Sequence, residues 1–158
     1  MNSHHTVAIG TWEGDKQQSI EYNSSIAVGI DCPRAKLRVS ILLDTIQEYQ
    51  VRYISSDEEI SEAVNKAGLI IGARGMAHEG ILQRKPVIVV GEYGFGGLVT
   101  PDTLHEQYNN YFRGKINGIK AEYFSLERLE EEIRRGFALT FQELQMMSNQ
   151  TIRFLHNI

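Results

Sequence analysis

AGLIIGARGMAHEGILQRKPVIVVGEYGFGGLV, residues 67–99, carries the clearest secondary-structure pattern in this chain. Two short apolar runs lie in it, at 68–72 and 86–91. Runs this short, rich in β-branched residues and without polar alternation, are typical of strands buried on both faces of a parallel sheet. Residues 74–84 lie between them and have room for about three helical turns, the length of a βαβ crossover helix. The segment therefore predicts two parallel strands joined by a helix.

The flanking sequence repeats this alternation of strand and helix patterns. We expect strands at 6–10, 26–30 and 51–54, and helices at 16–23, 33–48, 56–67, 126–135 and 139–155, with a further helix beginning near Thr103. Such alternation predicts an α/β fold, a three-layer Rossmann-like domain whose parallel sheet is wrapped by helices. No linker, internal repeat or low-complexity run interrupts the pattern, so residues 1–158 are expected to form a single domain.

Local signals refine the helix boundaries. Ser56 and Glu59 match a capping box at the start of one helix, and Gly68 is the expected left-handed residue at its end. Ser125 is the expected cap of the helix at 126–135. The last helix carries an apolar stripe that we expect to pack in the core, formed by Phe141, Leu144, Met147, Ile152 and Leu155.

Composition excludes several classes of partner and site. The formal net charge of -4 argues against a nucleic-acid partner found by bulk attraction. Cys32 is the single cysteine, so we predict neither a disulfide framework nor a thiolate metal site, and a cytoplasmic location is the default. No apolar segment approaches membrane-spanning length. His78 and Glu79 begin like a zinc motif, but Leu82 stands where its second histidine belongs, and no metal or cofactor is expected.

The ligand site is expected where the two strands of the 67–99 segment end. Open α/β sheets bind ligands at the carboxyl ends of their strands. After the second strand come Tyr93, Gly94, Gly96 and Gly97, and glycines of this kind can present bare backbone amides to a phosphate. The pattern is neither the dinucleotide fingerprint nor the P-loop. A tight turn at the strand end is the alternative interpretation.

The helix that follows the first strand begins with Arg74, Gly75 and Met76. Their amides lie at the positive end of the helix dipole and would suit a diphosphate. Glu79, further along the helix, could accept hydrogen bonds from a ribose diol, or it could simply complement the helix dipole. His78 is either an acid–base candidate or a helix residue with an ordinary packing role.

Taken together, three segments resemble the C-terminal, nucleotide-sugar-binding half of a GT-B glycosyltransferase of the retaining group 1 type. They are residues 10–16, 27–33 and 67–90, the last ending in the family-like run at 85–88. The resemblance implies that Lys16 contacts the donor diphosphate and that Glu79 holds the ribose. The 74–77 turn would lie beside the diphosphate and the 93–97 segment toward the sugar. Lys16 could otherwise be a solvated surface residue.

Two positions depart from that family. Thr11 stands where an arginine usually precedes the diphosphate lysine, and Ile71 replaces the first of two paired glutamates. These changes remove a charge partner of the diphosphate and a contact to the sugar.

The resemblance implies a donor-binding domain of an enzyme that transfers a sugar from a nucleoside diphosphate. GT-B enzymes react between two Rossmann-like domains, so we expect an acceptor-binding domain or partner subunit, and no activity from this chain alone. Two alternatives stay open. One is a sugar-nucleotide epimerase-like domain, and the other is a non-catalytic nucleotide-binding or interaction module that docks through the helix carrying Met146 and Met147.

Overall fold

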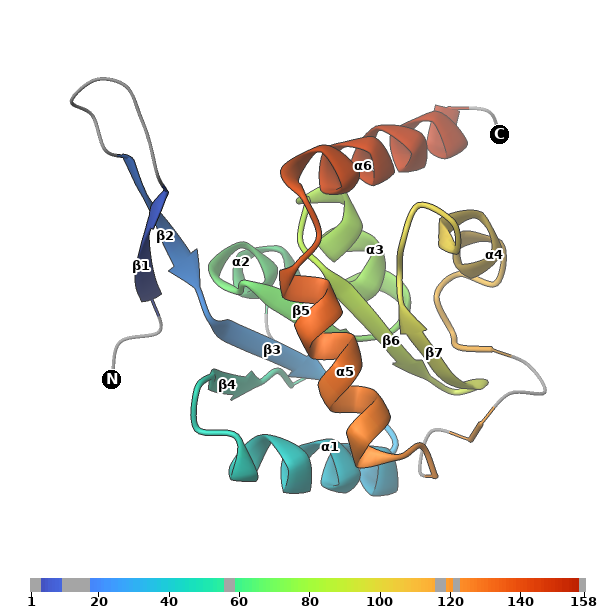
Figure 1. Ribbon diagram of the computed structural model, residues 1–158. Helices are drawn as coiled ribbons and strands as arrows, with labels where there is room; N and C mark the ends of the chain where they lie inside the picture. The colour runs from blue at the N-terminus through green and yellow to red at the C-terminus, as the bar shows by residue number, and fades with distance from the viewer. Residues whose placement is uncertain (1–3, 10–17, 56–58, 116–118, 121–122, 157–158) are drawn as a thin grey trace.

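The computed structural model describes residues 4–9, 18–55, 59–115, 119–120 and 123–156. Its centre is a five-stranded sheet in the order β4-β3-β5-β6-β7 (Figure 1). The strands are β3 (Ser25–Gly29), β4 (Gln50–Tyr53), β5 (Leu69–Gly72), β6 (Val87–Gly91) and β7 (Gly94–Leu98). Strands β4, β3, β5 and β6 are parallel, and β7 runs antiparallel to β6.

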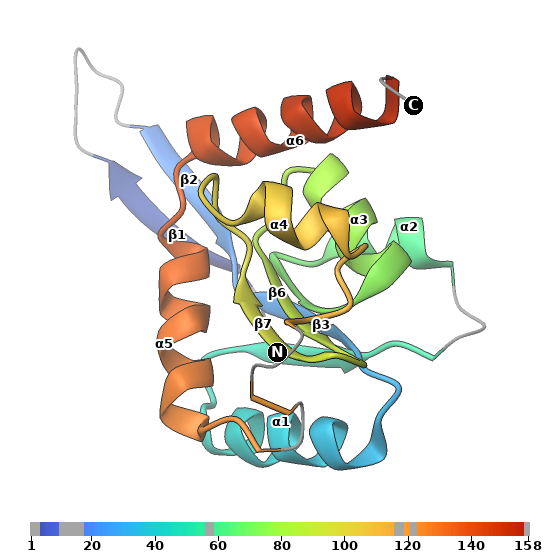
Figure 2. The ribbon, with the colours of Figure 1, turned by 90° about the vertical axis from the view of Figure 1, so that its right-hand side faces the viewer.

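Helices cover both faces of this sheet (Figures 1 and 2). The first face packs against α1 (Pro33–Thr45) and α5 (Leu126–Phe137). The second packs against α2 (Ile60–Lys66), α3 (Arg74–Leu82), α4 (Leu104–Asn109) and α6 (Phe141–His156). The α/β architecture with a mostly parallel sheet is therefore confirmed, and it is compatible with a Rossmann-like fold.

The predicted burial of the two central strands on both faces is also confirmed. Consecutive residues of β5 and β6 alternate between the two sides of the sheet, and Leu69, Ile70, Val87 and Ile88 are all 0% exposed. A strand in this position has no polar face because each face meets a helical layer. The continuous apolar runs in the sequence are the direct result.

Two helix starts follow the expected chemistry. Pro33 stands at the start of α1, where its missing N–H costs nothing. The Ser125 hydroxyl accepts a hydrogen bond from the Arg128 amide (3.0 Å) at the start of α5. The capping box predicted at 56–59 was wrong at Glu59, which is the extended residue just before α2 and makes no capping hydrogen bond with its side chain; Ser56 lies outside the described residues.

The N-terminal prediction was wrong in two respects. Residues 18–23 form a strand, β2 (Gln18–Asn23), and not a helix, while β1 (His4–Ile9) pairs with it in an antiparallel hairpin. This hairpin is a separate two-stranded sheet that projects from the body and leads into β3 (Figure 1). The 16–23 segment had little helical periodicity of its own, and pairing with β1 satisfies its backbone instead.

Gly68 does not end α2 in a left-handed conformation. The helix ends at Lys66, with Ala67 in an extended conformation, and the Gly68 amide donates to the Ser25 carbonyl (2.8 Å). A Cβ on Gly68 would lie 2.0 Å from the backbone oxygen of Asn23. This glycine therefore serves the close approach of two chain segments and not a helix cap.

Three of the five residues in the apolar stripe predicted for the last helix are exposed. Met147 is 1% exposed, but Phe141, Ile152 and Leu155 are exposed. The buried face of α6 is instead partly polar, because the Ser148 hydroxyl donates to the Leu82 carbonyl at the end of α3 (2.9 Å). No helix within the described ranges is long and apolar enough to cross a membrane.

Candidate functional site at the carboxyl ends of the strands

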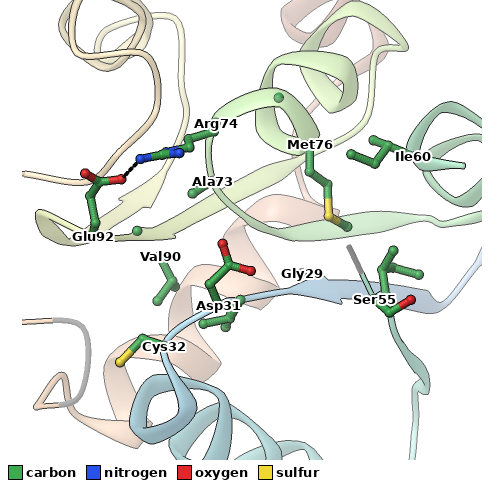
Figure 3. Close-up of a pocket in the computed structure, with 14 residues that line it drawn as sticks. Gly29, Asp31, Cys32, Ser55, Ile60, Ala73, Arg74, Met76, Val90 and Glu92 are labelled. Carbon is green, nitrogen blue, oxygen red and sulfur yellow. Dashed lines mark hydrogen bonds and ion pairs between the residues drawn. The ribbon is translucent and has the colours of Figure 1, made fainter. Parts of the chain in front are cut away.

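A pocket opens where the connections of the sheet diverge. The chain leaves β3 through α1 on one face of the sheet, and it reaches β5 through α2 on the other. The loops after β3 and β5 therefore part and leave a crevice between them, the switch point at which open α/β sheets bind ligands. A pocket of about 290 Å³ lies there, and its wall includes Gly29, Asp31, Cys32, Arg74, Met76 and Glu92 (Figure 3). We call it the switch-point pocket.

Paired glycines bring α3 close to the strand ends. Gly29 of β3 and Gly72 of β5 are register partners in the sheet. A Cβ on Gly29 would lie 2.3 Å from the Met76 sulfur. Because both positions lack a side chain, the first turn of α3 can sit directly over the ends of the two strands.

Two backbone donors of that first turn have no partner in the part of the chain that the structure describes. The Arg74 amide donates to the Phe112 carbonyl (3.0 Å) and the Ala77 amide to the Ala73 carbonyl (3.4 Å). The amides of Gly75 and Met76, which line the pocket, donate to no described residue. They stand at the positive end of the α3 dipole, so this wall of the pocket favours an anion.

Backbone strain is concentrated beside these donors. Arg74, Tyr111 and Phe112 have φ angles of 52°, 58° and 55°, in the left-handed region that residues with a side chain rarely adopt. The turn at 111–112 is what brings the Phe112 carbonyl to the Arg74 amide. Each such residue costs about 1–3 kcal/mol, so the rest of the fold must hold this end of α3 in place.

The side chains of the pocket are not strongly basic. The Arg74 guanidinium forms an ion pair with the Glu92 carboxylate, and both side chains are about half exposed. The Asp31 carboxylate reaches from the end of β3 towards the turn that starts α3 (Figure 3). Among the described lining residues there are thus two carboxylates for one guanidinium. The anion-binding character comes from backbone amides, while Asp31 can accept hydroxyl hydrogen bonds.

Three of the predicted site residues meet in this pocket, namely Arg74, Gly75 and Met76. Glu79 lies outside its wall, on the side of α3 that faces α2. Its carboxylate accepts a hydrogen bond from Gln83 Nε2 (2.8 Å) and lies 3.5 Å from the Ser61 hydroxyl. The ribose contact that the family resemblance implies for Glu79 is therefore not supported by the pocket geometry and stays a prediction.

His78 does not line the pocket and takes part in an aromatic contact of α3 with α4 and the segment that follows α4. Its ring centroid lies 6.0–6.2 Å from those of Tyr108, Tyr111 and Phe112. The Nε2 atom is buried without a hydrogen-bond partner among the described residues. This burial lowers the pKa of His78 below its ordinary value, partly opposed by the charge of Glu79. The ring therefore packs among these aromatic side chains, and its role as an acid or base stays a prediction.

The glycine-rich segment is a strand and not the ligand loop that we predicted. Gly94, Gly96 and Gly97 belong to β7, and none of them lines the switch-point pocket. Tyr93 also lies outside it, with its amide donating to the Arg113 carbonyl (2.7 Å) and its ring 5.0 Å from the Arg113 guanidinium. Lys16 is outside the described residues.

Sequence reasoning overlooked Asp31, Cys32 and Glu92 as pocket residues. Asp31 had a usable signal, because it follows the predicted strand at 26–30 and would stand at the same end of a parallel sheet as Arg74. Glu92 had none, since its role depends on the ion pair with Arg74. No group of three or more potential metal ligands occurs within the part of the chain that the structure describes.

Comparison of the chain with protein-family models, with curated proteins and with solved structures found no match. The resemblance to a GT-B half accordingly rests on the three sequence segments that carry it.

Proposed function

We propose that the chain binds the nucleoside diphosphate part of a nucleotide sugar in the switch-point pocket, as the donor-binding half of a glycosyltransferase. The observation that carries this proposal is the pair of amides without a partner among the described residues, Gly75 and Met76, at the start of a helix that opens onto a topological switch point. The pocket volume of about 290 Å³ is near the lower limit of ligand pockets, roughly 300–1,000 Å³. It suits the ribose and phosphates, with the rest of the ligand outside.

In this arrangement the diphosphate binds the α3 amides and the ribose diol binds Asp31. An acidic residue at a strand end accepts hydroxyl hydrogen bonds in dinucleotide folds, and the Asp31 carboxylate lies in the pocket wall. This assignment replaces Glu79 with Asp31 as the ribose contact. The Arg74 guanidinium would exchange its bond with Glu92 for one with a phosphate oxygen, since charged donors favour the more highly charged acceptor.

Transfer would depend on the leaving diphosphate. Negative charge grows on this group as the glycosidic bond breaks, and the dipole of α3 with Arg74 would stabilise it. The acceptor would have to be held by a second domain or subunit facing the pocket. The proposal therefore gives this chain the donor role and assigns catalysis only to the complete assembly.

Isothermal titration calorimetry of the full chain with UDP, GDP and ADP tests the proposal. We expect one nucleotide to bind with a dissociation constant below about 1 mM, and Asp31→Asn to weaken binding about tenfold through loss of a charged acceptor. Asp44→Asn, an exposed change on α1, is the matched control and should bind as the wild type does. Absence of binding by all three nucleotides at millimolar concentration would refute the proposal.

Two further variants separate the contacts that the family resemblance implies, Glu79 and Lys16, from the contact that the pocket geometry supports, Asp31. If Glu79→Ala weakens binding more than Asp31→Asn, the ribose lies on the α2 side of α3 and our assignment of Asp31 is wrong. Lys16→Ala tests the diphosphate contact that the resemblance implies. A loss of affinity there would bring residue 16 into the site.

A second candidate is a module that binds nucleotides without transferring sugar. The observation that favours it is the charge of the pocket wall, with Asp31 and Glu92 against Arg74, because a leaving diphosphate needs net positive surroundings. Because this chain alone is expected to have no activity, calorimetry with UDP-glucose and with UDP separates the two candidates. A donor-binding half should bind UDP-glucose at least as tightly as UDP, whereas a nucleotide module without room for the sugar should bind UDP-glucose more weakly than UDP.

A further inference from the structure

A second, larger cavity lies along the opposite, antiparallel edge of the sheet. Its volume is about 650 Å³, and it is bounded by β7, α4 and α5. Figure 2 shows this edge of the sheet with both helices beside it. It shares no lining residue with the switch-point pocket among the described residues. We call it the β7-edge cavity.

The glycines of β7 make room for polar side chains at this edge. A Cβ on Gly96 would lie 2.9 Å from Gln107 Oε1, and one on Gly97 would lie 2.8 Å from Glu132 Oε1. In their absence, Gln107 Nε2 donates to the Gly96 carbonyl (2.9 Å) and the Leu98 amide donates to Glu132 Oε1 (2.7 Å). Side chains of α4 and α5 thus occupy hydrogen-bonding positions that a neighbouring strand would otherwise take.

The buried carboxylate also holds two arginines. Glu132 is 2% exposed, and its Oε2 accepts a hydrogen bond from Arg135 Nη1 (2.6 Å) and lies 3.8 Å from Arg128 Nε. Arg128 also lies over the Phe95 ring, 5.5 Å from its centroid. Both arginine side chains are half exposed. Each guanidinium has five N–H donors, so most of them stay available to a ligand while the head groups are already oriented.

The charge of this cavity is opposite to that of the switch-point pocket. Its described lining residues include three cations, Lys115, Arg128 and Arg135, against two carboxylates, Glu106 and Glu132. The whole chain carries a net charge of -4, so cations are gathered here against the general trend. The hydroxyl and amide groups of threonine, asparagine and glutamine side chains also line it, beside the apolar Phe95, Leu98 and Ile119.

Protection of an edge strand accounts for part of this arrangement, because proteins cover such edges to prevent pairing with other chains. It explains Gln107 and Glu132. The helical spacing of α5 places Arg128 and Arg135 beside Glu132. Neither edge protection nor this spacing accounts for the cavity of about 650 Å³ that both arginines line, which is within the size range of ligand sites. We infer that the β7-edge cavity binds a small hydroxylated molecule carrying a carboxylate or phosphate, with the anionic group on Arg128 and Arg135.

Three probes that share one sugar test this inference on the full chain. Glucuronate carries a carboxylate, glucose 6-phosphate carries a phosphate, and glucose carries neither. Each is titrated to millimolar concentration while backbone amide resonances are followed by NMR. We expect at least one of the two anions to shift the Gly96 and Leu98 amides in a saturable way, with no saturable shift from glucose. Whichever anion binds identifies the chemical class.

Arg135→Gln should weaken that binding about tenfold or more, since a charge-assisted hydrogen bond is lost. Arg134→Gln is the matched control, because Arg134 is the neighbouring residue of α5, pairs with Glu130 and does not line the cavity. Lys115→Gln changes an exposed side chain of the cavity wall and tests the inference even if Arg135→Gln disturbs the fold. It should weaken binding of the anion severalfold.

The inference is overturned if neither anion binds, if glucose binds as well as the anions, or if Arg134→Gln and Arg135→Gln weaken binding equally. It is also overturned if the anions shift only the Gly75 and Met76 amides, since they would then occupy the switch-point pocket.

Discussion

The two cavities at opposite parts of one sheet are built by different means. The switch-point pocket is produced by topology, because the strand connections diverge there and leave backbone amides of α3 open. The β7-edge cavity is produced by side chains, because β7 turns back antiparallel and exposes an edge that Gln107 and Glu132 cover. The switch-point pocket therefore depends on the backbone amides of α3 and on side-chain charges that are half exposed. The β7-edge cavity depends on the buried Glu132 carboxylate and on the two arginines that it orients.

This difference predicts that the interactions of the buried Glu132 contribute more to stability than the exposed ion pair of Arg74 with Glu92. Glu132→Ala should lower the free energy of unfolding by about 3 kcal/mol, because loss of a buried partner leaves a buried amide and two arginines uncompensated. Glu92→Ala removes the exposed partner of Arg74 and should cost less than about 1 kcal/mol. Urea denaturation measures both. Equal effects would mean that the two cavities do not differ as described.

Glycine substitutions make the next comparison. Gly97→Ala should destabilise the protein by about 2 kcal/mol, because Gly97 has a φ of 78° and its Cβ would press on Glu132 Oε1. Gly75→Ala in the switch-point pocket should be neutral or stabilise by up to about 1 kcal/mol, since its Cβ would meet nothing closer than 3.9 Å. Thermal unfolding of the two variants, side by side, checks the contrast. If Gly97→Ala leaves the free energy of unfolding unchanged, then glycine is not required in β7 to make room for Glu132.

Removing the charge of Glu92 should change ligand affinity in the switch-point pocket and leave affinity in the β7-edge cavity unchanged. Glu92→Gln frees the Arg74 guanidinium from its ion pair and removes a negative charge near the proposed diphosphate, so nucleotide binding should tighten by about two- to fivefold. Calorimetry with UDP measures this change. Anion binding in the β7-edge cavity should stay as in the wild type. Weaker nucleotide binding by Glu92→Gln would show that Glu92 contacts the ligand directly.

The smallest effect expected is a pH dependence through His78. Burial lowers its pKa in the folded protein below the ordinary value of 6.5. As pH falls through 6.5, the unfolded chain binds the proton first, so this contribution to stability is full above that pH and is lost progressively below it. His78→Phe should flatten this part of the stability curve between about pH 7 and 5. His156→Gln at the exposed end of α6 is the control and should leave the curve unchanged.

Much of the fold was predictable because its central elements have local patterns. The apolar runs at 68–72 and 86–91 are buried strands, and the helix between them lies where the spacing required. Prediction failed where a segment had no strong pattern of its own. The hairpin strand β2 depends on pairing with β1, and the orientation of α6 depends on packing against α3.

The candidate site was predictable only in part, for a related reason. Arg74, Gly75 and Met76 were found because a helix start after a parallel strand is a feature of the local sequence. Glu79 was chosen for its place near the start of the same helix and by resemblance, and the structure has it bonded to Gln83 on another side of α3. The glycines at 94–97 were interpreted as a phosphate-binding loop, yet their absent side chains admit Gln107 and Glu132 to an edge strand.

The sequence of residues 67–99 by itself therefore determined the two strands, the helix between them and the start of that helix, because these follow from periodicity, β-branching and glycine placement in one short segment. The sequence did not determine which residues face one another in the folded protein. Only packing brings Arg74 to Glu92, Phe112 to the start of α3, and the Leu98 amide to Glu132. Their chemistry depends on distance in space, and a sequence records only distance along the chain.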